Sequence, residues 1–312
     1  MSDRSTLPAS PLRAIVVGGS GQIGGWLLRV LETRGHQPIG TYSTTSYPGL
    51  VPFDSANPGA SDWIRGQQAD VVFYPAGFTW VDGCERDPNK ARAANLDQPL
   101  ALARASASIG ARFVYFSTDY VFDGLDGPYD ESATPRPLSV YGQAKLEAEQ
   151  ALTDALGENV LLVRTTWVFG PERQGKNFAY QLARTLQEGR PLPCPSDQIS
   201  TPSYGPDVAR AVVSLVEQGR SGVVHVAGPD LLSRVQFAEA LALAFGLPSS
   251  LIEPGTTASL GQGAPRPLRS GLLTPKLNEW VPGVMRPMAD CLTDFRHRLE
   301  QGDSQVKPLV GS

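Results

Sequence analysis

The chain has few residues of the types that bind metals or form disulfides. Its 312 residues include three cysteines and three histidines, and neither set has the paired spacing of a metal site or a disulfide framework. We therefore predict no metal site. Isolated cysteines are typical of a reducing compartment, so we expect a cytoplasmic protein.

Long apolar runs are also missing. No stretch approaches the roughly 18 consecutive apolar residues that cross a bilayer, and the first dozen residues lack the apolar segment of a signal peptide. Basic residues are scattered, and the net charge is −4. Such a surface offers no electrostatic footprint for nucleic acid or an anionic membrane, so we expect neither as a partner.

Short apolar runs alternate with helical patterns through the first 170 residues. The predicted strands are residues 14–19, 38–43, 70–77, 112–118 and 159–169, and the predicted helices are residues 22–34, 85–107 and 139–155. Strands that are apolar throughout and connected by helices indicate a parallel sheet covered on both faces. The predicted fold class is therefore α/β, a Rossmann-type doubly wound parallel sheet.

The composition changes after residue 170, where residues 187–206 are rich in proline, serine and glycine. A helix at about 206–218 and a strand at 223–228 are expected to rejoin the sheet, and helices near 234–245 and 287–299 to form a smaller C-terminal lobe. The predicted division is a dinucleotide-binding Rossmann domain at 12–170 rejoined by 203–228, a substrate-binding lobe from 171–202 and 229–300, and flexible tails at 1–11 and 301–312.

A glycine-rich turn follows the first predicted strand. The segment GGSGQIG at 18–24 places Gly18, Gly21 and Gly24 between a strand and a helix. Glycine allows the tight turn, lets a pyrophosphate approach the main chain and lets the helix pack closely, while the helix N-terminus attracts the phosphates. The strand–turn–helix context favours a dinucleotide site over an ordinary tight turn.

The end of the second predicted strand bears on which dinucleotide binds. An acidic residue there would bind the ribose 2′-hydroxyl of NAD, but the chain has Thr41 and Ser43 and no carboxylate before Asp54. Hydroxyl groups without a repelling carboxylate tolerate a 2′-phosphate, although no arginine is near in the sequence to bind one. We expect a nicotinamide dinucleotide, with a slight preference for NADP(H) over NAD(H).

Tyr141 and Lys145 lie four residues apart, so both side chains leave the same face of the predicted helix 139–155. Ketone reduction needs a proton on oxygen, and a neighbouring ammonium lowers the tyrosine pKa from about 10 toward a useful range. A hydroxyl at Ser117 or Thr118, where strand 112–118 ends, would donate to the carbonyl oxygen. The simpler alternatives are a solvated helix face for the pair and a helix cap for Thr118.

Taken together, these segments resemble the extended short-chain dehydrogenase/reductases, and within them the dTDP-4-dehydrorhamnose reductase family. The resemblance runs from Ala14 to about Leu299. Among the segments that carry it are GGSGQIG at 18–24, FTWVDGCERDP at 78–88, STDYVFDG at 117–124, PLSVYGQAKLEAE at 137–149, RTTWVFG at 164–170 and SDQISTP at 196–202.

The resemblance implies roles for matching residues. Tyr141 would donate the proton, Lys145 would hold the nicotinamide ribose, and Thr118 would polarise the carbonyl. The implied cofactor contacts are Gly18, Gly21, Gln22, Ile23, Gly24, Thr41, Ser43, Ala76, Gly77, Thr79, Tyr141 and Lys145. The implied substrate contacts are Thr118, Asp119, Tyr120, Trp167, Asn177, Gln198 and Arg266. The alternatives are packing between the lobes for Trp167 and a helix cap for Asn177.

Two positions depart from the family pattern. Phe78 stands where the family usually has histidine or tyrosine, and Arg269 stands where a smaller residue is common. The first removes a polar group beside the cofactor, and the second leaves the base and sugar preference open. The exact substrate therefore does not follow from the resemblance.

The leading interpretation is an NAD(P)H-dependent reductase of the 4-keto group of a nucleotide-linked, dTDP-type 6-deoxy-4-ketohexose, serving deoxysugar or polysaccharide synthesis. One alternative is a non-catalytic dinucleotide-binding subunit resembling the methionine adenosyltransferase β subunit. Another is a nucleotide-sugar epimerase or dehydratase, although dehydratases carry a carboxylate directly after the Thr-Asp pair, where this chain has Tyr120. Family members are often dimers, which leaves a homodimer open.

Overall fold

The computed structural model describes residues 10–303 and 306–308. Its centre is a seven-stranded sheet in the order β11-β6-β5-β4-β1-β2-β3, in which every pairing is parallel. The strands are β1 (Arg13–Val16), β2 (Gln37–Tyr42), β3 (Val51–Pro52), β4 (Val71–Tyr74), β5 (Arg112–Thr118), β6 (Val160–Thr165) and β11 (Gly222–His225). The predicted doubly wound α/β fold is confirmed.

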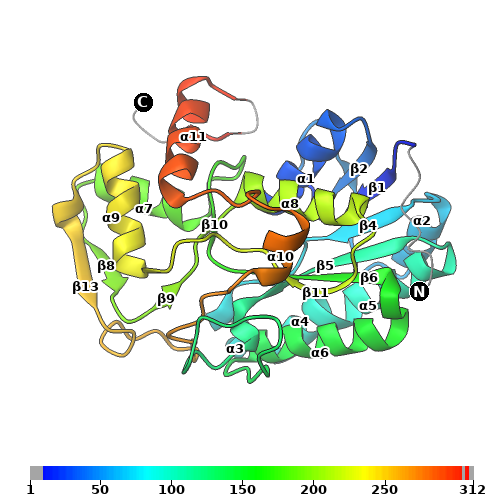
Figure 1. Ribbon diagram of the computed structural model, residues 1–312, viewed down its shortest axis with the longest axis horizontal. Coiled ribbons are helices and arrows are strands. Elements are labelled where there is room, and N and C mark those ends of the chain that lie inside the picture. The colour runs from blue at the N-terminus through cyan, green and yellow to red at the C-terminus, as the bar shows by residue number, and fades with distance from the viewer. Residues whose placement is uncertain (1–9, 304–305, 309–312) are drawn as a thin grey trace.

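Helices cover both faces of this sheet (Figure 1). One face carries α1 (Gln22–Thr33), α8 (Gly205–Glu217) and α10 (Pro275–Trp280), and the other carries α2 (Ala60–Gly66), α5 (Gln98–Ser108) and α6 (Val140–Leu156). Each face has its own apolar core, with Leu27 and Val212 fully buried in the first and Leu152 fully buried in the second. Two buried faces explain why the strands are apolar throughout rather than alternating.

The predicted helix 85–107 is wrong as one element, because the chain there forms four. They are α3 (Val81–Arg86), α4 (Pro88–Arg92), a π-helical turn (Ala93–Asp97) and α5. Pro88 starts α4, and the Asp87 carboxylate caps it by accepting from Lys90 N at 2.9 Å. In the π-helical turn the hydroxyl of Tyr115 donates to the backbone oxygen of Asn95 at 2.6 Å. That bond, donated from β5, occupies a helix carbonyl at the widened turn.

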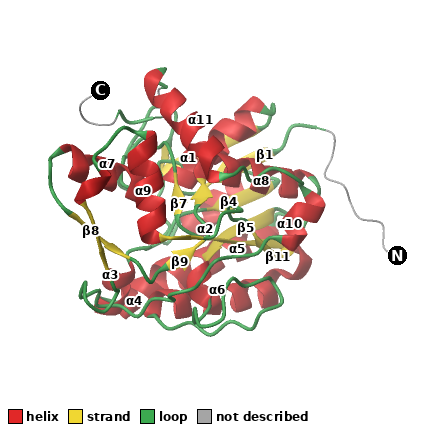
Figure 2. Cartoon of the chain, turned by 60° about the vertical axis from the view of Figure 1, so that its left-hand side comes forward, coloured by secondary structure: helices red, strands yellow, loops and turns green. Residues whose placement is uncertain are grey.

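The second lobe contains three helices around its own core, and Figure 2 turns it toward the viewer. The helices are α7 (Phe178–Gln187), α9 (Arg234–Ala244) and α11 (Met288–Glu300). Short strands pair as β7 (Val168–Phe169) with β10 (Ser203–Tyr204), β8 (Leu192–Pro195) with β13 (Ile252–Gly255), and β9 (Ile199–Ser200) with β12 (Leu232–Ser233). Tyr180, Phe237 and Phe295 are buried among these elements.

Two of the predicted boundaries differ from the structure. The predicted strand 159–169 is interrupted after β6, because Trp167 adopts a positive φ of 39° that no regular strand contains. The predicted lobe segment 229–300 also includes residues that pack elsewhere. Leu277 and Trp280 of α10 belong to the core beside α1 and α8, so this part of the chain returns to the Rossmann domain.

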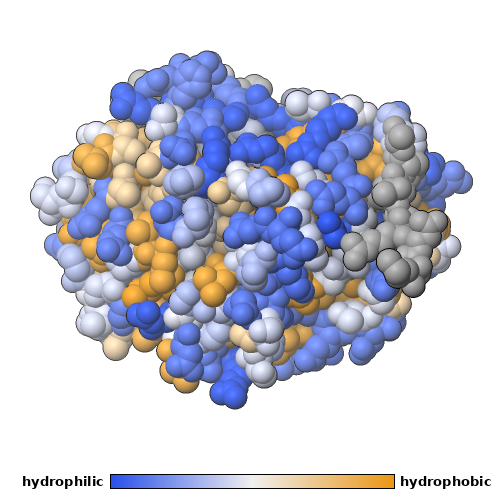
Figure 3. Space-filling view, in the orientation of Figure 1, coloured by the Kyte–Doolittle hydropathy of each residue, from blue (hydrophilic) through white to orange (hydrophobic). Residues whose placement is uncertain are grey.

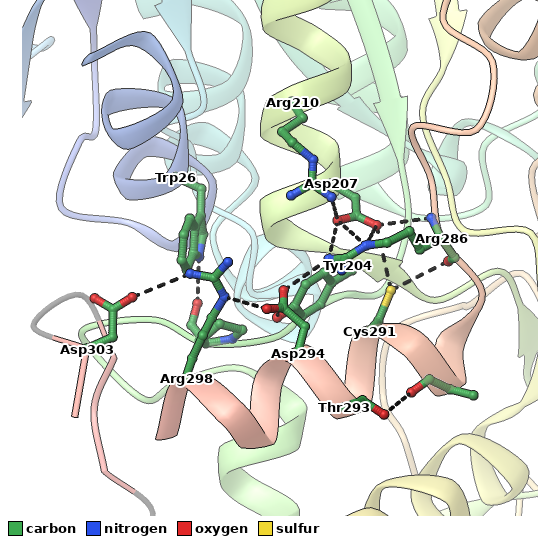
Figure 4. A network of polar contacts seen from close by, with 12 residues as sticks. Trp26, Tyr204, Asp207, Arg210, Arg286, Cys291, Thr293, Asp294, Arg298 and Asp303 are labelled. Atoms are coloured by element: carbon green, nitrogen blue, oxygen red, sulfur yellow. Dashed lines mark hydrogen bonds and ion pairs between the residues drawn. The ribbon is translucent and has the colours of Figure 1, made fainter. Parts of the chain in front are cut away.

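Charged side chains join α11 to the Rossmann domain (Figure 4). Asp207, fully buried in the first turn of α8, accepts from the backbone and guanidinium nitrogens of Arg286, with Nη2 at 2.8 Å, and also pairs with Arg210. Arg286 in turn pairs with Asp294 of α11 at 3.0 Å. The network fixes the position of the second lobe against the sheet.

The predicted N-terminal tail lies mostly outside the described residues, as does the end of the C-terminal one. Within the described part of the latter, Asp303 pairs with Arg29 and Arg298, and Val306 is buried in the second core. This part of the predicted tail is attached to the fold. The face in Figure 3 is mostly hydrophilic, with apolar side chains gathered near α9, where Leu243 is exposed. No helix in residues 10–303 is both long and apolar enough to cross a membrane.

Candidate active site

The glycine turn forms a close-packed cradle at the carboxyl end of β1. Gly18 has a φ of +91°, and its N–H donates to the Thr41 hydroxyl at 3.3 Å. A Cβ on Gly24 would stand 2.1 Å from the backbone oxygen of Gly18, so only glycine lets α1 approach the turn. Gly21 caps α1 without a side-chain hydrogen bond to the first-turn N–H groups. The helix N-terminus therefore keeps donors and partial positive charge for an anion.

The other residues predicted for the cofactor divide into two groups. Gln22 and Ile23 open α1, and Ile23 packs onto the core below. Thr41, by contrast, is buried, with its hydroxyl between Gly18 N and the backbone oxygen of Val16. Thr41 therefore shapes the turn from behind, and the exposed Ser43 is the hydroxyl available at the end of β2.

The loop after β4 faces the catalytic helix. Ala76 lies against Gly18, and a Cβ on Gly77 would stand 2.7 Å from Asn95 Oδ1 and 3.6 Å from Lys145 Nζ. The buried Asn95 side chain holds this loop by accepting from Phe78 N at 3.1 Å and donating to Phe78 O at 3.0 Å. Thr79 follows and is exposed. The loop thus places Ala76 and Gly77 between the glycine turn and Lys145.

Phe78, the residue that departs from the family pattern, packs in the apolar cluster that also contains Tyr141 and Cys84. Lys90 Nζ lies 4.7 Å from the centroid of its ring. The aromatic side chain therefore packs beside Tyr141, where the family usually has a polar group.

The three predicted catalytic residues meet at the carboxyl end of β5. Thr118 is the last residue of β5 and is hydrogen-bonded to the Tyr141 side chain. Ser139 caps α6 by accepting from Gly142 N at 3.1 Å, which fixes the helix start that carries Tyr141. Lys145, one turn further, donates from Nζ to the backbone oxygen of Phe116 at 2.8 Å and lies 6.0 Å from the Tyr141 ring centroid.

Burial controls the protonation of this pair. It raises the pKa of Tyr141 well above its ordinary value, a rise that the hydrogen bond with Thr118 opposes. Burial also lowers the pKa of Lys145 to about 7, against the opposing charge of Glu149. The expected lowering of the tyrosine pKa is therefore not found in this structure, because desolvation by burial is the largest effect on Tyr141. A neutral tyrosine is nevertheless the form that can give a proton to a developing alkoxide.

Glu149 and Arg164 were not singled out from the sequence, yet they continue the same helix face. Glu149 lies four residues beyond Lys145 and forms a buried, two-pronged ion pair with Arg164 of β6, with Nη2–Oε2 at 2.6 Å and Nε–Oε1 at 3.0 Å. The i, i+4, i+8 spacing of an acid after Tyr-x-x-x-Lys was the available signal. The pair anchors α6 to the sheet next to the lysine.

Asp119, one of the predicted substrate contacts, is engaged with other parts of the protein. It is buried, and its carboxylate accepts hydrogen bonds from the hydroxyls of Thr118, Ser200 and Ser270. Burial raises its pKa, and these hydrogen bonds oppose that rise. Asp119 therefore ties the end of β5 to two loops of the second lobe.

Tyr120 lies beside Tyr141, the predicted proton donor. Its ring meets that of Tyr141 edge-on, with centroids 5.7 Å apart. Burial raises the pKa of Tyr120 to about 12, while the nearby guanidinium groups of Arg266 and Arg234 oppose the rise. Tyr120 thus lies between Tyr141 and these two guanidinium groups.

Arg234 of α9 stacks on Trp167, which follows β6. The Arg234 guanidinium carbon lies 3.5 Å from the centroid of the Trp167 ring. Within residues 10–303 and 306–308, Arg234 makes no ion pair, and burial lowers its pKa to about 10. Trp167 holds a strained positive φ, as residues at ligand sites often do. Sequence reasoning missed Arg234 because no local motif surrounds it.

The remaining predicted substrate residues make contacts within the protein. Asn177 caps α7 by accepting from Ala179 N and donates to Gly170 O, which is the alternative role named for it. Gln198 donates to Thr257 and Gln262 in a neighbouring loop. Arg266, the third of these residues, forms an ion pair with Asp82 of α3.

In the ion pair between Arg266 and Asp82, Arg266 Nη2 lies 2.6 Å from Asp82 Oδ2. It joins the second lobe to the segment just after β4. Arg269, in contrast, is exposed, and its backbone N–H donates to Gly124 O at 3.0 Å. Arg266 is thus held in an ion pair, whereas Arg269 lies at the surface.

Two observations test whether these residues fit a nicotinamide dinucleotide. At Gly24 and Gly77 a Cβ would stand 2.1 Å from Gly18 O and 2.7 Å from Asn95 Oδ1, respectively, so both positions need glycine. Within the described chain, the hydroxyls of Ser117 and Thr165, buried at the ends of the adjacent strands β5 and β6, have no hydrogen-bond partner. Unpartnered polar atoms at the carboxyl edge of a doubly wound sheet are typical of a ligand crevice. The residues fit the group.

Three comparisons agree with this geometry. Residues 12–300 match the family described as RmlD substrate binding domain. The dTDP-4-dehydrorhamnose reductase of Mycobacterium tuberculosis is 32% identical over 88% of each chain, and a spore coat polysaccharide biosynthesis protein of Bacillus subtilis is 32% identical over 83% of this chain and 88% of that one. The crystal structure of a Bacillus anthracis dTDP-4-dehydrorhamnose reductase in complex with NADP superimposes with a TM-score of 0.84 at 26% identity, covering 93% of this chain and 100% of that one. The chain belongs to the RmlD substrate binding domain family.

Proposed function

We propose that the chain is a reductase that uses NADPH to convert the keto group of a nucleotide-linked 4-keto-6-deoxyhexose to a hydroxyl. One observation carries the proposal. Tyr141, Thr118 and Lys145 meet at the carboxyl end of β5, and the glycine cradle lies at the same edge of the sheet. A proton donor, a carbonyl-polarising hydroxyl and a ribose-binding ammonium are what a hydride transfer to a ketone needs.

The bound dinucleotide would supply the hydride for the carbonyl carbon. Thr118, whose hydroxyl donates to Asp119 in this structure, would turn that hydrogen to the carbonyl oxygen, where negative charge develops. Tyr141, neutral because burial raises its pKa, would give its proton to the same oxygen and would regain one from solvent. Lys145 would hold the ribose hydroxyls, and the Glu149–Arg164 pair would keep the helix that carries it in place.

We place the nucleotide-linked sugar in a cleft between the lobes, beside Tyr120, Trp167 and Arg234. Arg234, stacked on Trp167 and without an acidic partner in the described chain, is the group that we assign to the diphosphate. The loop held by the Arg266–Asp82 pair would close one side of the cleft. This assignment gives the diphosphate to Arg234 rather than to Asn177 and Gln198, whose side chains are engaged in the fold.

Dehydration or epimerisation would need a further free acid or base beside the sugar. The position after Thr118 and Asp119 carries Tyr120, and the Asp119 carboxylate is buried among hydroxyl groups. No other carboxylate takes part in the Tyr120 contacts, where Arg266 and Arg234 are the further charges. The geometry therefore favours reduction.

The proposal is tested by mixing the purified full-length chain with a dTDP-4-keto-6-deoxyhexose and either NADPH or NADH. A reductase consumes one reduced cofactor for each sugar alcohol formed, which absorbance and product NMR both measure. A dehydratase or epimerase returns its cofactor unchanged, and a regulatory subunit binds the cofactor without any conversion. Either of these results would overturn the proposal.

A further inference from the structure

A cavity of about 440 Å³ opens beside the end of β2, and Tyr141 is not among the residues that line it. Its walls come from the loop after β2, the loop before α7 and the C-terminal segment. The lining residues are Thr45, Tyr47, Arg173, Gln174, Lys176, Val306, Lys307 and Pro308. Three of the eight are cationic and none is acidic, so the cavity is suited to an anion.

The cations are not neutralised by the protein. Within the described residues, Arg173, Lys176 and Lys307 form no ion pair, and Arg173 lies 5.0 Å from the centroid of the Tyr47 ring. The acid next to Arg173 is Glu172, which is buried. Its Oε1 accepts from the backbone N–H of Lys176 at 2.8 Å and of Asn177 at 2.6 Å. That carboxylate is occupied by the main chain and leaves the cavity positive.

The cavity is connected to the dinucleotide cradle. Gln174, in the wall, donates from Nε2 to the backbone oxygen of Ser20 in the glycine turn at 2.7 Å. Thr45, in the opposite wall, follows the end of β2 by three residues. In a doubly wound sheet the adenosine ribose presents its 2′-position at the end of the second strand. A phosphate on that position would enter this cavity.

Lys307 is held in place although it lies close to the C-terminus. Its backbone N–H donates to the Glu172 carbonyl at 2.9 Å, and the neighbouring Val306 is buried. Upstream, Asp303 pairs with Arg298 of α11, as Figure 4 shows, and with Arg29 of α1. The C-terminal segment therefore brings a cation to the first lobe that the sequence near β2 does not provide.

We propose that Arg173, Lys176 and Lys307 form a binding site for the 2′-phosphate of NADPH and so set the preference for NADPH over NADH. The inference rests on the proposed use of a nicotinamide dinucleotide at the glycine cradle. It assigns the phosphate-binding cations to two segments that are distant from β2 in the sequence. It also gives the C-terminal segment a role in cofactor selection.

The test compares two cofactors on two variants of the full-length protein. In the double variant Arg173→Gln/Lys307→Gln, we expect the Kd of NADPH, measured by calorimetry, to rise about 10- to 150-fold, which is the value of one charge-assisted hydrogen bond. The Kd of NADH should change less than threefold. Arg190→Gln is the matched control, because Arg190 is an exposed arginine beyond α7 that pairs only with Glu188 in the described chain.

Adenosine 2′,5′-bisphosphate and 5′-AMP isolate the phosphate from the nicotinamide. The double variant should bind the bisphosphate more weakly and bind 5′-AMP with an unchanged Kd. Equal weakening of both nucleotides, or an unchanged Kd for NADPH, would overturn the 2′-phosphate site. These binding measurements need no sugar substrate, so failure of the keto-sugar reduction would leave this result readable on its own.

Discussion

Alanine at Gly24 should weaken cofactor binding, whereas alanine at the neighbouring Gly25 should leave binding unchanged and stabilise the fold. A Cβ on Gly24 would stand 2.1 Å from the backbone oxygen of Gly18 and within 2.9 Å of two further backbone atoms of the turn. Because real Cβ atoms do not approach closer than 3.0 Å, α1 would have to move away by about 0.9 Å, the difference between 3.0 and 2.1 Å. A Cβ on Gly25 would meet only Gly19 O, at an ordinary 3.6 Å.

The displacement of α1 determines how much NADPH binding should weaken. Losing one charge-assisted hydrogen bond from the helix N-terminus costs about 1.5–3 kcal/mol, so Gly24→Ala should raise the Kd of NADPH about 10- to 150-fold. Gly25→Ala should bind NADPH normally and unfold with about 0.5–1 kcal/mol more free energy, because alanine replaces glycine inside a helix. Calorimetry and thermal unfolding measure both quantities. The reasoning is refuted if Gly24→Ala binds NADPH within threefold of the parent, or if both variants weaken binding equally.

Three further results are expected. Asp207→Asn should lower the free energy of unfolding by about 2–4 kcal/mol in urea titrations, because Arg286 and Arg210 lose a buried partner but reach solvent; the exposed Glu279→Gln is the control. Arg234→Met should raise KM for the nucleotide sugar about 10- to 100-fold, with kcat and cofactor Kd changed less than threefold. Burial and Arg164 lower the pKa of His225 from 6.5 to about 3. As pH falls, His225 therefore binds a proton in the unfolded chain before it does so in the folded one, which lowers stability. Between pH 6.5 and 5 the free energy of unfolding should fall by up to about 1.4 kcal/mol per pH unit. This loss should be smaller in His225→Gln. An unchanged free energy of unfolding in Asp207→Asn would contradict the buried ion-pair network. An unchanged KM in Arg234→Met would contradict the diphosphate site, and an unchanged pH dependence in His225→Gln would contradict the lowered pKa of His225.

Local patterns predicted the parts of the fold that local physics decides. The turn at Gly18 and the strand–helix alternation depend on glycine conformations and apolar periodicity, both readable in the sequence. The break at Trp167 and the π-helical turn inside the predicted helix 85–107 were not readable, whereas Pro88 was an available signal for a helix start there. The first is a strained backbone fixed by its surroundings, and the second includes a hydrogen bond that Tyr115 donates from another strand.

The residues of the candidate site also divide into those that local patterns predict and those that only tertiary structure places. Tyr141 and Lys145 could be paired from their helical spacing, whereas Thr41 and Asp119 carry the expected side chains but direct them into the protein. Arg234 belongs to the cleft only through tertiary structure, which stacks it on a residue of a different segment. Sequence spacing fixes which residues share one helix face, and it does not fix which lobe loops meet across a cleft.

The central claim is that Tyr141 is the proton donor of a keto-sugar reductase, and Tyr141→Phe tests it most directly. Steady-state turnover of NADPH with a dTDP-4-keto-6-deoxyhexose should fall about 10²- to 10⁴-fold, because the ring remains and only the acidic proton is lost. The Kd of NADPH for the same variant should stay within threefold of the parent value. If Tyr141→Phe keeps a kcat within tenfold of the parent, the proton comes from another group and the assignment of this site is contradicted.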